Sequence, residues 1–256
     1  KLISVISAPK VVFSMLPDVC QENPPFKITQ ASEENSLAGT GLFYGKGVSP
    51  EGIFNPAAAG VGTHIIKYVF TSLNGCADSL SREIKVMPTP TVYAGKDTVV
   101  LQGGEIRLKG TAAGSNLSYK WSPSLGLNRD DIPDPVASPF DDMTYTLTVT
   151  SDQGCVSMDK VFVKVLKEPE VPNAFSPNGD GMNDLWNIKY LESYSNASVK
   201  VFSRYGALVY VSNGGYAAPW NGQMNGIDLP SGTYYYIVDP KTKGRKLVSG
   251  FVTILR

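Results

Sequence analysis

The stretch Ile84-Lys85-Val86-Met87-Pro88-Thr89-Pro90-Thr91-Val92 decides the fold, because its pattern occurs three times along the chain. The other copies begin at Ile3 and Val163, so the pattern returns after 81 and then 79 residues. β-Branched residues at alternate positions that lead into prolines are typical of a last strand, a stiff connection and the next first strand. The stretch therefore predicts tandem modules of about 80 residues.

A second pattern supports the same repeat. The segments Thr71–Cys76 and Thr150–Cys155 both begin with Thr-Ser and end with Gly-Cys, and they also lie 79 residues apart. Short strands with frequent turns in modules of this size are typical of immunoglobulin-like sandwiches. The sequence thus predicts an all-β chain of three tandem immunoglobulin-like β-sandwich domains. We expect boundaries at 9–88, 89–168 and 169–256, with residues 1–8 as the closing strand of a preceding module in a longer protein.

Charge and composition argue against several classes of function. The 256 residues include 23 Lys and Arg against 23 Asp and Glu, so no positive field attracts nucleic acid. The apolar runs are too short for a direct membrane span. His64 is the only histidine, and Cys20, Cys76 and Cys155 form no Cys-x-x-Cys pair, which argues against a Ser-His-Asp triad and common zinc or iron–sulfur sites. Scattered Asp and Glu leave a carboxylate pair open, but we expect a protein that is not an enzyme.

Aromatic residues indicate the interior of the second module. Trp121 lies in the alternating segment Tyr119–Ser122, which predicts a central strand with the indole in the core. The alternative is a tryptophan that stacks on a ligand. Tyr145 precedes the Gly-Cys turn, where sandwiches often have a corner tyrosine. We expect His64 at the matching place of the first module, with a structural role.

After Pro169 the repeat ends and a different module begins. The segment 199–210 alternates on both sides of a central turn, which predicts a β-hairpin. Residues 229–238 and 247–255 predict two further strands. No segment has a helical period, so the sequence predicts a third sandwich.

Two turns in this last module combine glycine with large aromatic residues. They are Arg204-Tyr205-Gly206 and Trp220-Asn221-Gly222. We expect Gly206 and Gly222 to have positive φ, since glycine has no Cβ to hinder that conformation. Their aromatic residues are expected in the core.

The order of the motifs FSPNGDGxND, VxVFxRYGxLVY, WNG, LPSGTYYY and GFVTILR resembles the gliding-motility-associated C-terminal domain of Bacteroidota, the type B sorting domain of the type IX secretion system. The resemblance covers nearly all of residues 171–256. It implies export across the outer membrane to the cell surface or the medium. It also implies the type IX translocon and a PorP/SprF-like outer-membrane barrel protein as partners. The residues that carry it are Asn178, Gly179, Asp180, Gly181, Asn183, Asp184, Arg204, Tyr205, Gly206, Trp220, Gly232, Gly250 and Arg256. Ser203 and Tyr205 depart from it, since Asn and Trp are more usual there.

The first two modules resemble the PKD-like and immunoglobulin-like repeats of large bacterial surface proteins, on the segments Phe54–Gly60 and Trp121–Pro123 and the two Gly-Cys segments. The resemblance implies a disulfide between Cys20 and Cys76. It leaves Cys155 as a small buried hydrophobic residue or as an intermolecular thiol. Asp78-Ser79-Leu80 and Asp97-Thr98-Val99 are similar to the O-glycosylation motif of Bacteroidota, which makes Ser79 and Thr98 candidate acceptors.

One segment has the spacing of a calcium loop. Ser176, Asn178, Asp180 and Asp184 occupy loop positions 1, 3, 5 and 9, with Gly181 at position 6. Against a Ca²⁺ site, position 12 lacks the bidentate glutamate of such loops. The alternative is a network of Asx turns at the start of the module.

The sequence favours a C-terminal stalk and export signal of a surface or secreted protein. One alternative is an adhesin in which Trp121, Tyr119 or the strand Tyr234–Tyr236 binds a surface glycan or a protein. Another is the non-catalytic tail of a secreted hydrolase. An exposed row of these aromatic residues would favour the adhesin, and their burial would favour the stalk. A free edge strand that a partner extends is a further way to recognise the export signal.

Overall fold

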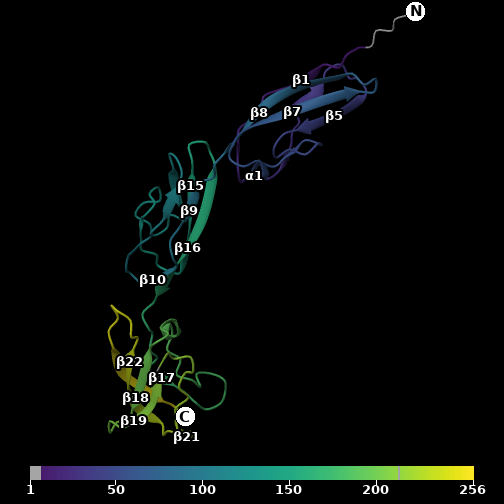
Figure 1. Ribbon diagram of the computed structural model, residues 1–256. Coiled ribbons are helices and arrows are strands. Elements are labelled where there is room, and N and C mark those ends of the chain that lie inside the picture. The colour runs from purple at the N-terminus through teal and green to yellow at the C-terminus, as the bar shows by residue number, and fades with distance from the viewer. Residues whose placement is uncertain (1–6, 213) are drawn as a thin grey trace, which may run out of the picture.

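The computed structural model describes residues 7–212 and 214–256 (Figure 1). Within these residues, helix is confined to α1 (Pro56–Ala59) and the 3-10 turn η1 (Leu191–Ser193), and the other regular elements are strands. The prediction of an all-β chain is therefore confirmed. The strand predicted for residues 1–8 falls mainly on residues 1–6, which lie outside the described residues. Among the helical segments described, none has the length and hydrophobicity of a membrane span.

Buried side chains form three separate hydrophobic clusters, each with its own strands. Figure 1 shows three bodies that follow one another along the chain. We call them the N-terminal module (β1–β8), the middle module (β9–β16) and the C-terminal module (β17–β23). The domain boundaries inferred from the repeat remain a prediction.

The N-terminal module is a two-layered sandwich. One sheet has the order β2-β8-β7-β5, and the pairs β1-β4 and β3-β6 form the other layer. All pairs are antiparallel except β2 with β8, which run parallel. The opening segment thus contributes first to one layer and then to the other, an arrangement of immunoglobulin-like type. The strands are β1 (Val11–Phe13), β2 (Val19–Cys20), β3 (Phe26–Lys27), β4 (Ala31–Glu33), β5 (Gly39–Tyr44), β6 (Ile53–Phe54), β7 (Gly62–Ser72) and β8 (Ala77–Met87).

The middle module repeats this topology. Its larger sheet has the order β10-β16-β15-β13 with β10 parallel to β16, and β9-β12 and β11-β14 form the other layer. The strands are β9 (Thr91–Tyr93), β10 (Thr98–Leu101), β11 (Ile106–Arg107), β12 (Thr111–Ala113), β13 (Ser118–Ser122), β14 (Val136–Ala137), β15 (Met143–Thr150) and β16 (Val156–Leu166).

The long hairpins of the two modules pair in the same register. Thr71 lies opposite Ala77 in β7–β8, and Thr150 lies opposite Val156 in β15–β16. Both pairs close the hairpin next to the Gly-Cys turn, at a spacing of 79 residues. The repeat found in the sequence is therefore a repeat of the strand pairing.

The C-terminal module has one large sheet, in the order β17-β23-β22-β18-β19. Its second layer is much reduced and consists of the hairpin β20–β21 and the long segment between β17 and β18. An isolated bridge pairs Trp186 of that segment with Trp220, which lies just before β20. Only the larger layer of the predicted third sandwich is a full sheet. The strands are β17 (Ala174–Phe175), β18 (Ser198–Phe202), β19 (Leu208–Ser212), β20 (Gln223–Met224), β21 (Ile227–Asp228), β22 (Gly232–Asp239) and β23 (Val248–Ile254).

Candidate functional site

Trp220, from the WNG motif, lies at the centre of the C-terminal core and is only 2% exposed. Its ring centroid lies 5.4 Å from that of Phe175, 6.2 Å from Trp186 and 6.0 Å from Tyr234. Its backbone N–H donates to the Tyr216 hydroxyl at 2.9 Å, and this hydroxyl donates to the Trp186 carbonyl at 2.6 Å. Burial raises the pKa of Tyr216. Trp220 therefore holds the reduced second layer on the sheet.

The turn Arg204-Tyr205-Gly206 projects from the hairpin β18–β19. Gly206 has φ +80° and Gly222 has φ +76°, so both predictions of positive φ are confirmed. The expectation that Tyr205 lies in the core is wrong, because its side chain is 81% exposed. The turn lies beyond the last residue pair of this hairpin, Phe202 with Leu208. The Arg204 guanidinium lies over the Tyr205 ring, 4.7 Å from its centroid.

Two further motif glycines belong to the β22–β23 ladder. Gly250 lies opposite Tyr236, and a Cβ on Gly250 would come within 2.7 Å of the Tyr236 hydroxyl. Glycine here leaves room for the Tyr236 ring, whose centroid lies 5.2 Å from that of Trp186. Gly232 has φ +149° where β22 begins. These glycines therefore have local structural roles.

The terminal motif residue Arg256 ties the end of the chain to two loops. Its guanidinium lies 3.2 Å from the Asp228 carboxylate and donates to the Leu229 carbonyl. Its Nε donates to the Pro177 carbonyl at 3.3 Å. This side chain connects the β20–β21 region to the segment that follows β17.

The segment FSPNGDGMND folds into a compact turn around the Asp184 carboxylate. Asp184 Oδ1 accepts from the N–H groups of Asn178 at 3.0 Å and Gly179 at 2.7 Å, and Oδ2 accepts from Gly181 N–H at 2.8 Å. Asp180 Oδ1 and Oδ2 accept from a backbone N–H at 2.8 Å and from Asn178 Nδ2 at 2.9 Å. Asn183 has φ +52°. These bonds give every carboxylate oxygen of the segment a donor.

This arrangement is the Asx-turn network that the sequence offered as the alternative to calcium. The Ser176 hydroxyl points within the turn too, to the Met182 carbonyl at 3.4 Å. A Ca²⁺ site on Ser176, Asn178, Asp180 and Asp184 stays a prediction. The hydrogen bonds are by themselves a sufficient reason for these residue types at these positions.

The hydrogen bonds to Asp184 predict a pH dependence of stability. They hold the pKa of this carboxyl below its usual value, with the N–H groups of Gly179 and Gly181 as the largest causes. A group whose pKa is lower in the folded state stabilises the fold above its unfolded pKa, and this contribution is lost as pH falls through the folded pKa. We expect Asp184→Asn to destabilise the C-terminal module at pH 7 but to have almost no effect near pH ~2. Urea unfolding followed by tryptophan fluorescence at several pH values measures this difference.

The matched control is Glu192→Gln, which neutralises an exposed carboxylate of the same module. Its effect should stay small across the range, since exposed charges contribute little. A loss of stability in Asp184→Asn that is equal at pH 7 and at pH ~2 would contradict the role assigned to the carboxylate charge.

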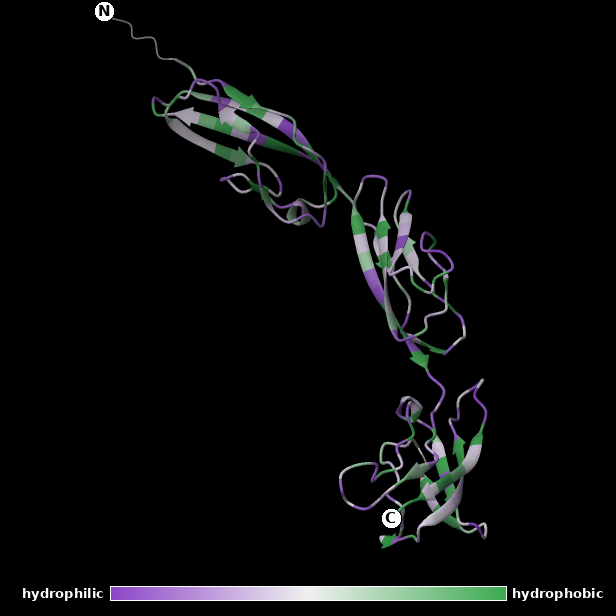
Figure 2. Ribbon diagram, turned by 180° about the vertical axis from the view of Figure 1, so that it is seen from behind, coloured by the Kyte–Doolittle hydropathy of each residue, from purple (hydrophilic) through white to green (hydrophobic). Residues whose placement is uncertain are grey.

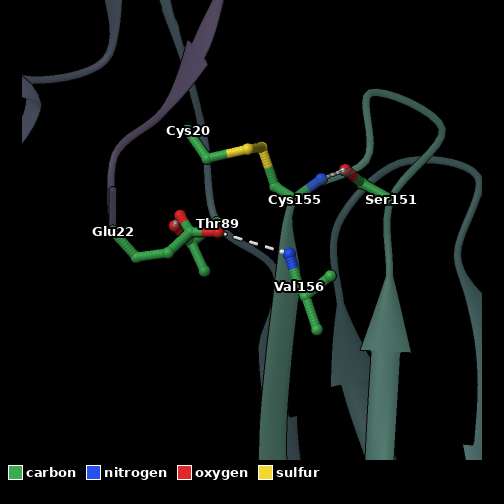
Figure 3. The surroundings of a disulfide bond; sticks show 6 residues. All are labelled: Cys20, Glu22, Thr89, Ser151, Cys155 and Val156. Atoms are coloured by element: carbon green, nitrogen blue, oxygen red, sulfur yellow. Dashed lines mark hydrogen bonds between the residues drawn. A yellow bond between two sulfur atoms is a disulfide. The ribbon is translucent and has the colours of Figure 1, made fainter. Parts of the chain in front are cut away.

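Cys20 forms its disulfide with Cys155 of the middle module, with 5.5 Å between the Cα atoms (Figure 3). The predicted bond between Cys20 and Cys76 is therefore wrong, as is the view of Cys155 as an unpaired residue. Cys20 pairs with Met87 at the end of β8, whereas Cys76 directly precedes Ala77 at its start. Ten strand residues separate these ends by roughly 33 Å, and cysteines more than ~7 Å apart cannot be joined. Cys76 is free.

Further contacts join the same two modules beside the disulfide (Figure 3). The Val156 N–H donates to Glu22 Oε1 at 3.3 Å, and the Thr89 hydroxyl donates to the other oxygen of Glu22. Cys20, Glu22 and Cys155 also form a group with metal-ligand spacing among the described residues, but both sulfurs are bonded to each other and thiolates are the usual ligands. No feature of the sequence indicated a role for Glu22, and Thr89 stood out only as part of the connection between two modules.

The aromatic residues of the middle module have structural roles. Trp121 is fully buried, and its Nε1 donates to the Ile132 carbonyl at 2.9 Å, so the prediction of a core tryptophan is confirmed. Tyr145 is also fully buried, with its hydroxyl on the Leu125 carbonyl at 2.9 Å.

The expectation that His64 matches Tyr145 is wrong. Tyr145 lies opposite Val161, and the residue in that register of the first module is Ile66, opposite Arg82. His64 instead contacts the Gly60 carbonyl through Nε2 at 2.7 Å, which is a local structural role.

The strand Tyr234–Tyr236 presents no aromatic row to solvent. Tyr234 is buried, Tyr236 is half-buried against the core, and Tyr235 alone of the three is exposed. Tyr119 is half-buried as well. Trp121 and Tyr234 are therefore closed to a glycan, and Tyr235 is the ring of this strand that a partner can reach.

The candidate O-glycosylation acceptors lie in paired strands. Ser79 and Thr98 are half-buried, in β8 and β10. The aspartates before them accept backbone N–H bonds at 2.8 Å, Asp78 from Val11 and Asp97 from Phe162. These aspartates therefore link neighbouring segments, and glycosylation stays a prediction.

Residues 169–254 match the family model described as the CHU_C type IX secretion signal domain. The match coincides with the C-terminal module and includes the WNG turn, the Arg204–Gly206 turn and the Asp184 loop. No curated protein matches the sequence.

The solved structures that are similar to this chain consist of several domains in tandem. Immunoglobulin domains 1–4 of Sidekick-1 share 11% identity over 96% of this chain and 76% of that one, with a TM-score of 0.36. Human CDH23 EC21–23 shares 8% sequence identity over 97% of this chain and 100% of that one, with a TM-score of 0.33. A variant of titin domains I67–I69 shares 8% over 98% and 99%, with a TM-score of 0.32.

Proposed function

Because residues 169–254 carry a CHU_C type IX secretion signal domain, we propose that the C-terminal module directs the chain to the type IX translocon and through the outer membrane. The match to this family is the observation that carries the proposal. A secretion signal implies export, to the cell surface or the medium. The finer part of the proposal is attachment at the surface through a PorP/SprF-like barrel protein. The favoured class of function is transport and display rather than catalysis.

The C-terminal module has the organisation of a self-contained signal. Its hydrophobic cluster is separate from the other two, and one residue from the end of β16, Leu166, is buried in it. The Leu166 carbonyl accepts from Arg245 at 2.6 Å, and the next carbonyl, of Lys167, accepts from the Tyr194 hydroxyl at 2.7 Å. A functional signal fragment should therefore begin at Leu166.

The first two modules support the role of a stalk. They follow one another along the chain (Figure 2), and the disulfide with the Glu22 contacts joins them. These links restrict bending between the two modules. We propose that they hold the N-terminal end of the chain away from the C-terminal module and so away from the cell surface.

The exposed turn at Arg204 and Tyr205 supports a contact with the export machinery. Next to it, a row of apolar side chains crosses the outer face of the sheet, in which Phe202 lies opposite Tyr235 and Tyr235 opposite Phe251. Tyr235 is 52% and Phe251 is 54% exposed. Apolar surface of this kind is typical of a site that another protein covers.

We expect the chain to lose export completely when residues 166–256 are deleted, in a cell with a working type IX system. A reporter protein fused to residues 166–256 should appear outside the cell, because these residues contain the complete secretion signal domain. Immunoblots of cell and medium fractions and protease treatment of whole cells measure both results. A known type IX substrate in the same cells is the control. Retention of the fused reporter inside the cell while the control is exported would refute the proposal.

A further inference from the structure

The turn before Cys76 has the same construction as the turn before Cys155. The Ser72 N–H donates to the Cys76 carbonyl at 2.9 Å, and the Ser151 N–H donates to the Cys155 carbonyl at 2.9 Å. The glycines that precede the two cysteines both have φ +81°. Each cysteine directly precedes the long strand of its hairpin. Cys76 and Cys155 are therefore equivalent positions of the repeat.

The surroundings of the two turns are similar, although the aspartates involved are offset in the repeat, since Asp78 follows Cys76 by two residues and Asp159 follows Cys155 by four. The first strand of each module packs beside the hairpin, with β1 paired to β4 and β9 paired to β12. An aspartate of the long strand fixes that first strand in both modules. Val11 N–H donates to Asp78 Oδ2 at 2.8 Å, and Ala94 N–H donates to Asp159 Oδ2 at 2.8 Å. The end of the N-terminal module where the chain enters is thus built like the end of the middle module that carries Cys155.

The middle module shows what this end of a module binds. Cys155 is bonded to Cys20, which lies at the far end of the preceding sheet, opposite the last residue of β8. Cys76 has the same position but a free, half-buried thiol. Leu73, in the same turn, is 82% exposed. One turn therefore carries an exposed apolar residue and a free thiol, at the position whose counterpart in the middle module is bonded to another module.

We propose that Cys76 is a disulfide site for a cysteine of another β-sandwich module, stacked end to end on the N-terminal module as that module stacks on the middle one. The partner cysteine is expected beside the last residue of the partner's closing strand, the position that Cys20 occupies here. The proposal rests on the geometry of the repeat and is independent of the export signal.

The bond requires an oxidant. The two thiols lose two protons and two electrons as the S–S bond forms. In an oxidising compartment, the disulfide of a thiol–disulfide oxidoreductase accepts them and becomes a dithiol. In the test below, oxidised glutathione has this role and is reduced to two molecules of glutathione.

The test supplies the partner as a second copy of the N-terminal module in front of residues 8–256. Residues 8–88 with Cys76→Ser are joined directly to Ala8, which reproduces the proline-containing connection between the existing modules. We expect peptide mapping without reduction to find the added Cys20 bonded to Cys76. The native Cys20–Cys155 bond should remain, and maleimide labelling of Cys76 should fall at least ~10-fold.

The matched control replaces the added Cys20 with Ser, and Cys76 should then label fully. Hydrogen exchange in the added β7–β8 hairpin shows whether the copy is folded. The junction is made both after Met87 and after Pro88, so that misfolding at one junction leaves the other to decide. A folded copy with Cys76 still free, and with the Cys20–Cys155 bond intact, would overturn the proposal.

Discussion

Trp220→Ala is expected to lower the free energy of unfolding of the C-terminal module by about 3–5 kcal/mol and to abolish export. The indole is almost fully buried and packs against Phe175, Trp186 and Tyr234. The core on this side of the sheet lies under loops, and the Trp220 backbone also holds them through the Tyr216 hydroxyl and the bridge to Trp186. Removal of the ring also leaves a cavity. Loops that relax into this cavity would break the bridge between Trp186 and residue 220. Since small domains have only ~5–15 kcal/mol of stability, this loss is a large part of the total.

The control separates folding from recognition within the same module. Tyr205→Ala changes an aromatic side chain that is 81% exposed, so the free energy of unfolding should change by less than about 0.5 kcal/mol. Urea unfolding and the export assay are applied to both variants. If Tyr205→Ala is stable but not exported, the turn is a contact with the machinery. If Trp220→Ala unfolds and is still exported, recognition does not require the folded module, and the proposed role of its core is wrong.

Cys155→Ser is expected to destabilise the first two modules and to loosen the junction between them. The disulfide joins residues 135 positions apart, and closing a loop of this size constrains the unfolded chain by about 5 kcal/mol in the chain-entropy model. The two modules have separate cores, so each should still fold without the bond. The hydrogen bonds that Glu22 accepts from Thr89 and Val156 then remain at the junction. We expect a lower midpoint of thermal unfolding for the first two modules and a broader distribution of dimensions in small-angle scattering.

Cys76→Ser is the matched control, because it removes the free cysteine and keeps the bond. It should leave the unfolding temperature and the scattering curve of the oxidised chain unchanged. Treatment of the parent protein with dithiothreitol should reproduce the effect of Cys155→Ser. An identical scattering curve before and after reduction would show that the other junction contacts suffice.

Local sequence signals were enough for the features that depend on neighbours in the chain. Alternation of β-branched residues predicted the closing strands β8 and β16. The Gly-Cys turns have equal registers because the turn sets the pairing of the strands that it joins. Gly206 and Gly222 have the expected positive φ for the same local reason. The exposure of Tyr205 was not predictable in this way, because it depends on how far the second layer extends over the sheet.

The sequence by itself determined the all-β class, the repeat of 79 residues and the family of the C-terminal module, since each depends on the order of residues within one module. Only the tertiary structure decided the partner of Cys20. Spacing along the chain placed Cys76 and Cys155 at the same position of their modules, but it did not show at which end of the sheet that position lies. Cys20 lies at the opposite end of β8 from Cys76, so a cysteine of the next module is within reach and the one in its own module is not.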